Sequence, residues 1–407
     1  MKKHLILLCD NYPLTAGEFF IDDEMKVLAP FFQRIVVVLK KQSEQNNLNR
    51  YIPENLEVIT YTENINFKTK IFGFLNIFRI FFIKEWGRAL KKYSLRYCFS
   101  IFKIMYMDVL RAKELLKYFK KTSDINNENT IYYSYWHDYK ALTLCFLPLK
   151  TQKIARAHGW DVFADRHTPP YLPLKNYILE NLTQTFSISE SGKKYFYNYT
   201  DGKYNDKITV SRLGKFNHRQ PLLSKINKHN IIISCSNIIP LKRLHLVIDL
   251  LYELDMEHLK WIHFGDGILR EEIQKYAQEK LRTNAFEFKG IVSNPDILDF
   301  YAENYVDLFI NVSESEGIPV SIMEAISAGI PVVATNVGGT SEIVNHENGF
   351  LIEKDFNIKD TAITIKNYLL SSEENKLNYR KNAYNFWKEN YNAEKNYSIF
   401  VAKIFTI

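Results

Sequence analysis

The chain has 407 residues, of which 46% are hydrophobic and 24% charged, and its formal net charge is +7. This length favours two domains of ordinary size, and the composition excludes a disordered chain. The four cysteines form neither a CxxC pair nor a Cys/His cluster with metal-site spacing, which favours a reducing compartment without disulfides or structural zinc.

The first half of the chain contains short apolar runs typical of strands that are buried on both faces of a parallel sheet. The first ten residues resemble a signal peptide, but their apolar stretch is only about five residues long and is followed by no small-residue cleavage site. A first buried strand explains them better. Helical or loop stretches separate the runs, as in a doubly wound α/β domain. The predicted strands are Leu5–Leu8, Ile35–Leu39, Thr130–Tyr133, Lys153–Ala157 and Thr185–Ile188.

Three turns that follow these strands contain candidate site residues. The turn after the first strand contains Gly17, and the turn after the third strand contains Trp136 and His137. The fourth strand ends in an H-G-W-D sequence that contains His158 and Asp161. The carboxyl ends of parallel strands meet at one sheet edge, where doubly wound sheets bind ligands. The side chains of Trp136, His137 and Asp161 are therefore candidates for an acceptor site, with core packing as the alternative. His158 is a candidate catalytic residue, with a structural histidine as the alternative.

The segment from Lys68 to Lys121 holds most of the positive charge, with 14 Lys/Arg against 3 Asp/Glu and 13 aromatic residues among them. Its apolar run Ile71–Ile83 has 13 residues and contains Arg79, so it is too short to span a bilayer. A basic helix with an apolar face can lie on an anionic membrane. A domain helix with a solvated basic face is the alternative. Nucleic-acid binding is not expected, because no RRM, KH or helix-turn-helix pattern occurs.

The alternation of strands and helices starts again after Gly214. The polar stretch Phe216–Asn230 predicts a linker. We therefore expect one domain over residues 1–215, a second over 216–385, and a helical segment over 386–407 that packs back toward the first domain. The second domain has predicted strands at Ile231–Cys235, Trp261–Phe264, Phe286–Phe288, Leu308–Val312 and Val332–Thr335, with helices at Leu244–Leu254, Gly267–Leu281, Pro295–Ala302 and Pro319–Ala328.

The stretch Ser313–Thr335 is the most informative part of the sequence, because it begins at the carboxyl end of a predicted strand. Gly317 allows close backbone approach, and Pro319 suits the first position of a helix whose free N–H groups favour a diphosphate. Glu316 lies before this helix and Glu324 inside it, roughly 9 Å along the axis at ~1.5 Å per residue. One carboxylate can meet a sugar while the other accepts hydrogen bonds from ribose hydroxyls. An ordinary amphipathic helix with surface acids is the alternative.

This stretch resembles the family 4 glycosyltransferases, whose signature is S-x-x-E-G-x-P with a second Glu eight positions after the first. The positions that fit in register are Ser313, Glu316, Gly317, Pro319, Glu324, Ala325, Gly329 and Pro331. The resemblance implies that Glu316 contacts the donor sugar and Glu324 the ribose. It also places Gly317, Ile318 and Pro319 in the donor site.

A second stretch, Ser234–Leu244, fits the same family less closely. The family has an Arg and a Lys on the donor phosphates, and Lys242 fits the Lys. Asn237 stands where the Arg is expected and Arg243 where a Gly is expected. Arg243 is a candidate replacement because a guanidinium can fork onto phosphate oxygens. A solvated basic turn is the alternative.

In the first half, the turns with Gly17 and His158 resemble the family's N-terminal glycine loop and its histidine motif. The resemblance implies that the Gly17 loop faces the diphosphate. It also implies that His158 lies near the donor sugar, where it would stabilise charge by hydrogen bonding.

The family resemblance implies the GT-B fold, in which two Rossmann-like doubly wound domains face each other across a cleft. The implied reaction moves a hexosyl unit from a nucleoside diphosphate sugar to a hydroxyl acceptor with retained anomeric configuration. The chain looks most like bacterial capsule, O-antigen or exopolysaccharide enzymes. A lipid-linked saccharide is then the expected acceptor, and the expected location is cytoplasmic and peripheral at the inner face of the plasma membrane.

No cofactor or metal is expected, because no Asp-x-Asp lies in a suitable loop and cationic side chains with a helix N-terminus can hold the diphosphate. Two alternatives stay open. A nucleotide-sugar 2-epimerase shares the architecture, and a non-catalytic sugar-nucleotide-binding protein is favoured by the departure at Asn237.

Overall fold

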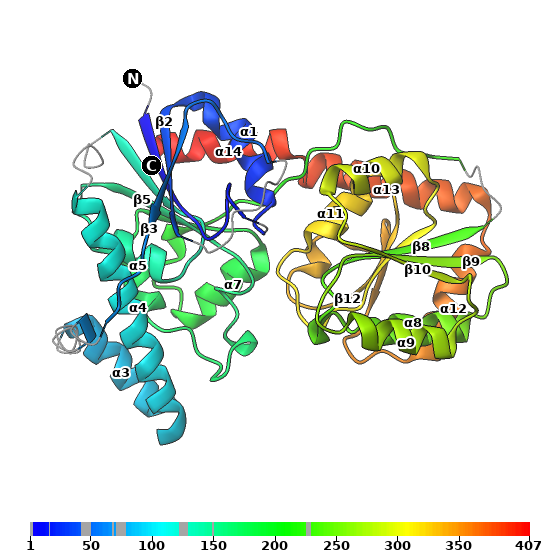
Figure 1. Ribbon diagram of the computed structural model, residues 1–407, viewed down its shortest axis with the longest axis horizontal. Coiled ribbons are helices and arrows are strands. Elements are labelled where there is room, and N and C mark those ends of the chain that lie inside the picture. Colours follow the sequence, from blue (N-terminus) through cyan, green and yellow to red (C-terminus); the bar gives the residue numbers. More distant parts are fainter. Residues whose placement is uncertain are drawn as a thin grey trace. The chain divides into compact units, whose positions relative to one another are not determined.

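The computed structural model describes residues 3–15, 17–41, 50–66, 69–70, 79–121, 129–148, 150–224 and 229–407. The described chain forms two α/β units, each an all-parallel sheet with helices on both faces (Figure 1). Met1–Leu213 and Asn396–Ile407 form the N-terminal unit, and Gly214–Lys395 form the C-terminal unit. The prediction of two doubly wound domains is therefore confirmed.

The N-terminal unit is built on a seven-stranded sheet. Its strands are β1 Lys3–Leu8, β2 Phe32–Lys40, β3 Leu56–Tyr61, β4 Thr130–Ser134, β5 Gln152–Ala157, β6 Gln184–Ser187 and β7 Ile208–Val210. Its helices are α1 Phe20–Leu28, α3 Ile80–Lys92, α4 Leu95–Lys121, α5 Tyr139–Cys145, α6 Lys175–Asn181, α7 Glu190–Tyr199 and α14 Ala393–Thr406. The strand order is β3-β2-β1-β4-β5-β6-β7, so the direction of winding reverses between β1 and β4.

The C-terminal unit repeats this plan with six strands. The strands are β8 Asn230–Cys235, β9 Leu259–Phe264, β10 Phe286–Gly290, β11 Leu308–Asn311, β12 Val332–Thr335 and β13 Gly349–Ile352. The helices are α8 Leu244–Leu254, α9 Arg270–Lys280, α10 Asn294–Glu303, α11 Val320–Ser327, α12 Ile358–Leu369 and α13 Glu373–Asn390. The order β10-β9-β8-β11-β12-β13 places the reversal of winding between β8 and β11.

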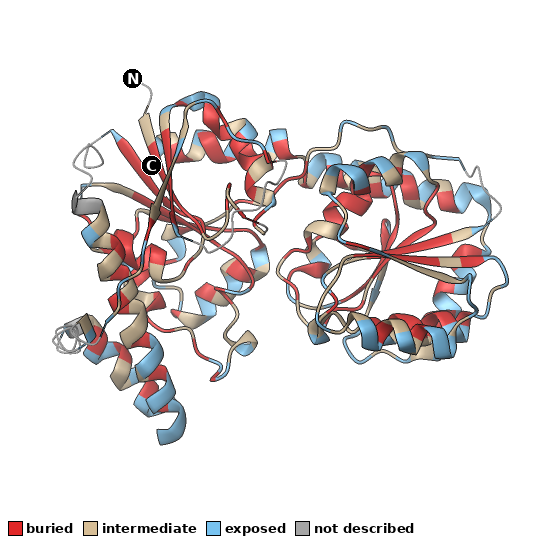
Figure 2. Cartoon of the chain, in the orientation of Figure 1, coloured by how far each residue is buried: buried red, intermediate tan, exposed pale blue. Residues whose placement is uncertain are grey.

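Burial explains why the central strands are continuous apolar runs. All five residues of β4 and all four of β12 are buried, because helices cover both faces of each sheet (Figure 2). Side chains at helical spacing on α4, such as Ile101, Met105 and Val109, join the core on one face of the N-terminal sheet.

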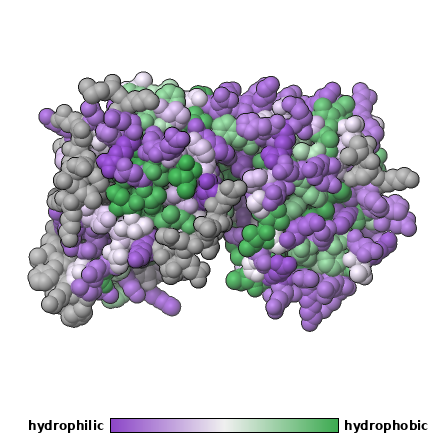
Figure 3. Space-filling view, turned by 45° about the horizontal axis from the view of Figure 1, so that its top comes forward, coloured by the Kyte–Doolittle hydropathy of each residue, from purple (hydrophilic) through white to green (hydrophobic). Residues whose placement is uncertain are grey.

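Hydrophilic side chains cover much of the visible face of the C-terminal unit (Figure 3).

Helices α3 and α4 form a hairpin that extends away from the N-terminal sheet, and its far end is largely exposed (Figures 1 and 2). Leu95 and Phe99 there are 82% and 79% exposed. The exposed cations of the hairpin include Lys84, Arg88, Lys91, Lys92, Arg96 and Lys103. Of the predicted apolar run Ile71–Ile83, residues 71–78 lie outside the described residues. Within the described chain, no helix has the length and apolar character needed to cross a membrane.

The chain enters and leaves the C-terminal unit through two segments that lie side by side. Lys215 pairs with Asn392 in an isolated parallel bridge, and a Cβ on Gly214 would lie 2.4 Å from the Ala393 Cα, so only glycine fits there. The boundaries of the C-terminal unit lie after Leu213 and after Lys395, whereas the sequence suggested boundaries at residues 215 and 385. The second boundary lies later than predicted because α13 packs on the C-terminal unit through Trp387. The Nε1 of Trp387 donates to the Lys215 carbonyl at 3.2 Å.

Candidate functional site

Two of the predicted donor-site residues, Lys242 and Glu316, lie beyond the carboxyl ends of β8 and β11, where the C-terminal sheet reverses its winding. Lys242 ends a short 3-10 helix, Pro240–Lys242, after β8, and Glu316 lies in the turn after β11. The structure brings them together, with 2.5 Å between Lys242 Nζ and Glu316 Oε1. Asn311 Nδ2 donates to the same carboxylate oxygen at 3.3 Å. Open α/β sheets bind ligands at such a reversal point.

Backbone contacts fix the turn that contains Glu316. The Glu314 N–H donates to the Leu241 carbonyl at 2.9 Å, which ties this turn to the one after β8. On its other side, Gly338 has a φ of 56°, and a Cβ there would lie 1.8 Å from the Glu316 carbonyl oxygen. The turn after β12 can therefore approach Glu316 only with glycine at this position.

The structure gives Arg243 a contact inside the same unit. Its φ is 50°, and its Nε donates to the Val312 carbonyl at 2.8 Å. Its Nη2 is buried and has no hydrogen-bond partner among the described residues. Burial lowers the pKa of this guanidinium. Asn237 is exposed, so the site presents a neutral side chain where the family resemblance leads us to expect an arginine.

Helix α11 begins one residue later than the sequence suggested, because Pro319 is its N-cap with an extended ψ of 117°. The Pro319 carbonyl accepts from the N–H groups of Ile322 and Met323. The N–H groups of Val320 and Ser321, at the very start of the helix, have no helical carbonyl to pair with, so they can bind an anion. Gly317 precedes this turn, and Ile318 is buried beneath it.

Glu324 lies on α11 with a residue exposure of only 4%. Its Oε1 accepts from Asn294 Nδ2 at 2.5 Å and lies 3.5 Å from Lys215 Nζ. The sequence analysis did not identify Asn294 or Lys215, although Asn294 follows β10 at the carboxyl edge of the sheet. The Tyr301 hydroxyl is also buried and has no hydrogen-bond partner among the described residues.

In the N-terminal unit, the turn after β1 is closed by its own carboxylate. Gly17 has a φ of 101°, and the next residue, Glu18, has a φ of 51°. The Glu18 carboxylate accepts from the N–H groups of Asp10, Asn11 and Tyr12 at 2.6–3.2 Å. These amides form the kind of nest that binds anions, and here the anion is a side chain of the same turn.

His158 is buried among aromatic rings at the carboxyl end of β5. Its ring centroid lies 4.6 Å from that of Trp136, 5.1 Å from Tyr135 and 5.8 Å from Phe20. Neither ring nitrogen has a hydrogen-bond partner among the described residues. Burial, and secondarily the charge of Arg156, lowers the pKa of His158 to about 3, so the imidazole is neutral near pH 7.

Asp161 and His137 fix the neighbouring turns. The Asp161 carboxylate accepts from the His158 N–H at 2.5 Å and from the His137 N–H at 2.6 Å, which links the turns after β4 and β5. His137 is fully buried, and its Nδ1 lies 3.2 Å from Lys175 Nζ. Trp136 is half-buried, with its Nε1 donating to Glu18 at 2.5 Å. Trp160 in the same H-G-W-D turn is exposed, and only its aromatic character within a polar turn could have singled it out.

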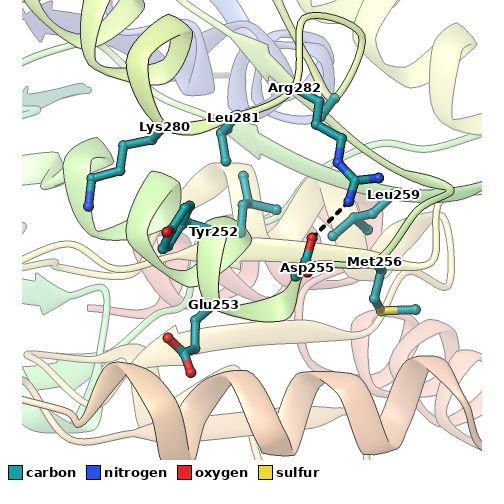
Figure 4. Close-up of a pocket in the computed structure, with 10 residues that line it drawn as sticks. Tyr252, Glu253, Asp255, Met256, Leu259, Lys280, Leu281 and Arg282 are labelled. Carbon is teal, nitrogen blue, oxygen red and sulfur yellow. Dashed lines mark hydrogen bonds and ion pairs between the residues drawn. The ribbon is translucent and has the colours of Figure 1, made fainter.

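A cavity of about 350 Å³ lies at the opposite edge of the C-terminal sheet (Figure 4). Leu259 begins β9 and Ala285 precedes β10, so the cavity is at the amino ends of these strands. Arg282 and Asp255 pair across its rim at 3.0 Å. None of the predicted site residues lines this cavity. In the part of the chain that the structure describes, no three His, Cys, Asp or Glu residues are grouped as a metal site.

Residues 217–386 match the family model described as Glycosyl transferases group 1. The C-terminal unit is a group 1 glycosyltransferase domain. Its match covers Lys242, Glu316 and Glu324, and its boundaries lie close to those of the unit.

Two curated relatives align with slightly more than half of the chain. Protein CapJ of Staphylococcus aureus is 28% identical over 235 residues, which are 55% of this chain and 57% of the relative. Spore coat protein SA of Bacillus subtilis is 26% identical over 237 residues, or 54% and 60% of the two chains. The chain thus spans little more than half the length of these relatives. The O-antigen biosynthesis glycosyltransferase WbnH of Escherichia coli is 37% identical over a shorter stretch of 75 residues, which are 18% of this chain and 22% of the relative.

Solved glycosyltransferase structures have the same fold over the whole chain. Anabaena Alr3699/HepE, solved in complex with UDP and glucose, superposes with a TM-score of 0.68 at 15% identity and 100% coverage of both chains. TarM superposes with a TM-score of 0.71 at 14% identity and 99% coverage of both. The predicted GT-B fold is therefore confirmed.

Proposed function

We propose that the protein is a retaining glycosyltransferase that moves a hexosyl unit from a nucleoside diphosphate sugar to a hydroxyl acceptor. The observation that supports this most directly is the Lys242–Glu316 pair, 2.5 Å apart where the C-terminal sheet reverses its winding and just before α11. An ammonium group and the first N–H groups of a helix suit a diphosphate, and a carboxylate suits sugar hydroxyls. HepE, a structural neighbour, was solved with UDP and glucose.

In this proposal the donor replaces contacts that the chain now makes with itself. Lys242 exchanges Glu316 for a phosphate oxygen, and Glu316 then accepts from the sugar. Glu324 exchanges Asn294 for the ribose hydroxyls. His158 acts as a neutral hydrogen-bonding group beside the sugar, because its pKa of about 3 keeps it uncharged. We propose that no metal is needed, since Lys242 and the α11 N-terminus provide the positive charge at the diphosphate.

We further propose that the acceptor is a lipid-linked saccharide of surface polysaccharide assembly, met at the inner face of the plasma membrane. One relative is named as an O-antigen biosynthesis enzyme, which supports this class of product. The exposed cations and apolar side chains of the α3–α4 hairpin support a location at an anionic membrane surface.

The test is release of nucleoside diphosphate from a panel of nucleotide sugars, with and without saccharide acceptors, by wild type and Glu316→Gln. We expect one donor to be turned over by wild type, acceptor to accelerate its loss, and Glu316→Gln to lose most turnover while still binding nucleotide. NMR of the product should show the anomeric configuration of the donor. An inverted product would remove the retaining assignment, and product formed from donor alone without cleavage would indicate an epimerase.

A non-catalytic nucleotide-sugar-binding protein is the second candidate. Asn237 leaves one expected phosphate contact without a cation, and Arg243 has its Nε committed to the Val312 carbonyl. Tight nucleotide binding with neither hydrolysis nor transfer from any donor in the panel would favour this candidate.

A further inference from the structure

Trp160 is the most exposed of the five tryptophans, all of which lie in the described chain. Its exposure is 59%, whereas Trp86 and Trp136 are half-buried and Trp261 and Trp387 are buried. An indole offers a large apolar face with a negative π-surface, and proteins normally bury most of it. A single exposed apolar side chain is common on protein surfaces, so exposure alone assigns no role to Trp160.

The turn that presents Trp160 is held rigidly. The residue after Trp160 is Asp161, whose carboxylate accepts two backbone N–H groups at 2.5 and 2.6 Å. The Phe163 N–H donates to the Gly159 carbonyl at 3.1 Å, which closes the turn. His167 supports the tryptophan itself, with ring centroids 4.3 Å apart and with its Nε2 2.6 Å from the Trp160 carbonyl oxygen. The indole is therefore exposed to solvent on a turn that has little freedom to rearrange.

A second, independent feature of the same turn points to a ligand. His158 is 6% exposed, and neither of its ring nitrogens has a hydrogen-bond partner among the described residues. Buried polar atoms without partners are rare in folded proteins, and a bound molecule is one way to satisfy them. Two peptide bonds separate the two residues, so their Cα atoms are at most about 7.6 Å apart. This separation is within the span of a ligand of the size of one sugar ring with its hydroxyls.

We infer that Trp160 is the stacking platform for a pyranose ring of the acceptor. One face of many pyranoses carries C–H groups with partial positive charge, which match the negative face of an indole. Their hydroxyls lie around the ring. A neutral imidazole has one donor and one acceptor nitrogen, so His158 can bond such a hydroxyl with one nitrogen and keep the other for the donor sugar. That the bound saccharide is the acceptor rests on the proposed function, whereas the stacking of a pyranose on Trp160 does not.

Intrinsic fluorescence tests the platform without any enzymatic assay. Wild type and Trp160→Phe are titrated with methyl β-D-glucopyranoside, methyl β-D-galactopyranoside and methyl N-acetyl-β-D-glucosaminide. We expect at least one sugar to shift or quench the emission of wild type, and the change to be absent in Trp160→Phe. If no sugar changes the wild-type emission, or if Trp160→Phe changes equally, the platform is overturned. A response to octyl but not methyl glucoside would show that the site takes an alkyl chain, which also overturns it.

Kinetics then test the role in acceptor binding. Trp160→Ala should raise the KM for a saccharide acceptor about tenfold or more, and Trp160→Phe should recover part of this loss. The KM for the donor and the hydrolysis of donor without acceptor should stay within twofold of wild type. Tyr252→Ala is the matched control, because Tyr252 is also an exposed aromatic residue but lies in the C-terminal unit.

The outcomes separate the platform from the proposed function. An active wild type with unchanged acceptor KM in Trp160→Ala would overturn the platform and leave the transferase in place. A wild type that turns over no nucleotide sugar, while its Trp160 emission responds to a methyl glycoside, would overturn the proposed function and leave the platform in place.

Discussion

Glu324 is a buried carboxylate whose partners include an amide and a lysine, those of Asn294 and Lys215. A ribose contact at this carboxylate is a charge-assisted hydrogen bond, which is worth ~1.5–3 kcal/mol when removed. Glu324→Ala should therefore weaken nucleoside diphosphate binding about tenfold or more by calorimetry.

Glu324→Gln distinguishes the contact from the fold, because glutamine keeps the shape and one acceptor oxygen while removing the charge. It should also weaken binding, with its thermal midpoint near that of wild type. Glu353→Gln, at an exposed position of the same unit, should change neither quantity. Equal affinity of wild type and a folded Glu324→Gln would refute the ribose assignment.

His158 should matter for turnover rather than for nucleotide affinity, since the predicted nucleotide contacts are in the C-terminal unit. His158→Ala should lower kcat strongly and leave the nucleotide Kd within a few fold. His158→Phe keeps the packing against Tyr135 and Trp136 but removes both ring nitrogens. It should be as inactive as the alanine variant while staying folded. Normal turnover in His158→Phe would return the residue to a packing role.

The low pKa of His158 also predicts how stability depends on pH. Between the pKa of about 3 in the folded state and about 6.5 in the unfolded state, only the unfolded chain binds the proton. Acidification below pH 6.5 therefore destabilises the fold, by about 2 kcal/mol at pH 5 from this residue. His158→Phe should lose less stability than wild type between pH 7 and pH 5 in denaturant titrations. Equal losses would show that the buried imidazole is protonated in the folded state.

At the scale of elements, the α3–α4 hairpin supports a prediction of salt-sensitive membrane binding. Each cation near an anionic surface contributes about 1 kcal/mol, and screening acts over ~10 Å at 0.1 M salt. The protein should co-sediment with anionic liposomes at low salt, leave them at high salt, and ignore neutral liposomes. Exposed Leu95 and Phe99 at the hairpin end can add apolar contact with the lipid.

Two charge-matched variants localise the effect. One replaces four exposed hairpin cations by Gln: Lys84, Arg88, Lys91 and Lys92. The other replaces four exposed lysines of the C-terminal unit by Gln: Lys275, Lys359, Lys366 and Lys381. Only the first should reduce binding. If wild type does not bind anionic liposomes even at low salt, the basic face is merely solvated and a soluble acceptor is the better explanation.

The central strands could be predicted from sequence because they are continuous apolar runs between helical stretches. The sequence analysis missed three strands, β3, β7 and β13, and all three are edge strands. In addition, β7 has only three residues and β13 only four. In β3 only Tyr61 is buried, so its sequence shows no continuous apolar run. Edge strands keep one side near solvent, and their pattern is weaker for that reason.

The candidate donor site was partly predictable for a similar reason. Lys242 and Glu316 follow adjacent strands, and a family resemblance identified both. Asn294 and Lys215 lie 30 and 109 residues before Glu324, and nothing in their local sequence signals that contact. The closure of the Gly17 turn by Glu18 likewise depends on three backbone amides, which no residue pattern reveals.

At the scale of the whole molecule, the last helix returns to the unit in which the chain began. In α14 the side chains of Tyr397, Phe400, Val401 and Ile404 are buried in the N-terminal unit. Gln152 Nε2 on β5 donates to the Ile404 carbonyl at 2.5 Å. The integrity of the N-terminal unit therefore depends on residues that follow the complete C-terminal unit in sequence.

A buried ion pair depends on the same helix. Arg156 Nε lies 2.9 Å from Glu24 Oε2, and both side chains are fully buried. The ring of Phe400 lies 4.3 Å from the Arg156 guanidinium carbon and covers this pair. Without α14 the guanidinium would meet water on one side. Each fully buried apolar side chain contributes about 1.5–3 kcal/mol, so four of them approach the stability of a typical domain, about 5–15 kcal/mol.

Deletion of residues 396–407 should therefore unfold the N-terminal unit and spare the C-terminal unit. Calorimetry of the truncated chain should lose one unfolding transition, and nucleoside diphosphate should still raise the midpoint of the other. A milder pair uses neighbouring residues of α14, buried Phe400 and exposed Ile399. Phe400→Ala should cost about 3–5 kcal/mol in the N-terminal transition, whereas Ile399→Ala should cost little. Two intact transitions after the deletion would mean that the N-terminal unit holds its core without α14, contrary to the burial of these four side chains.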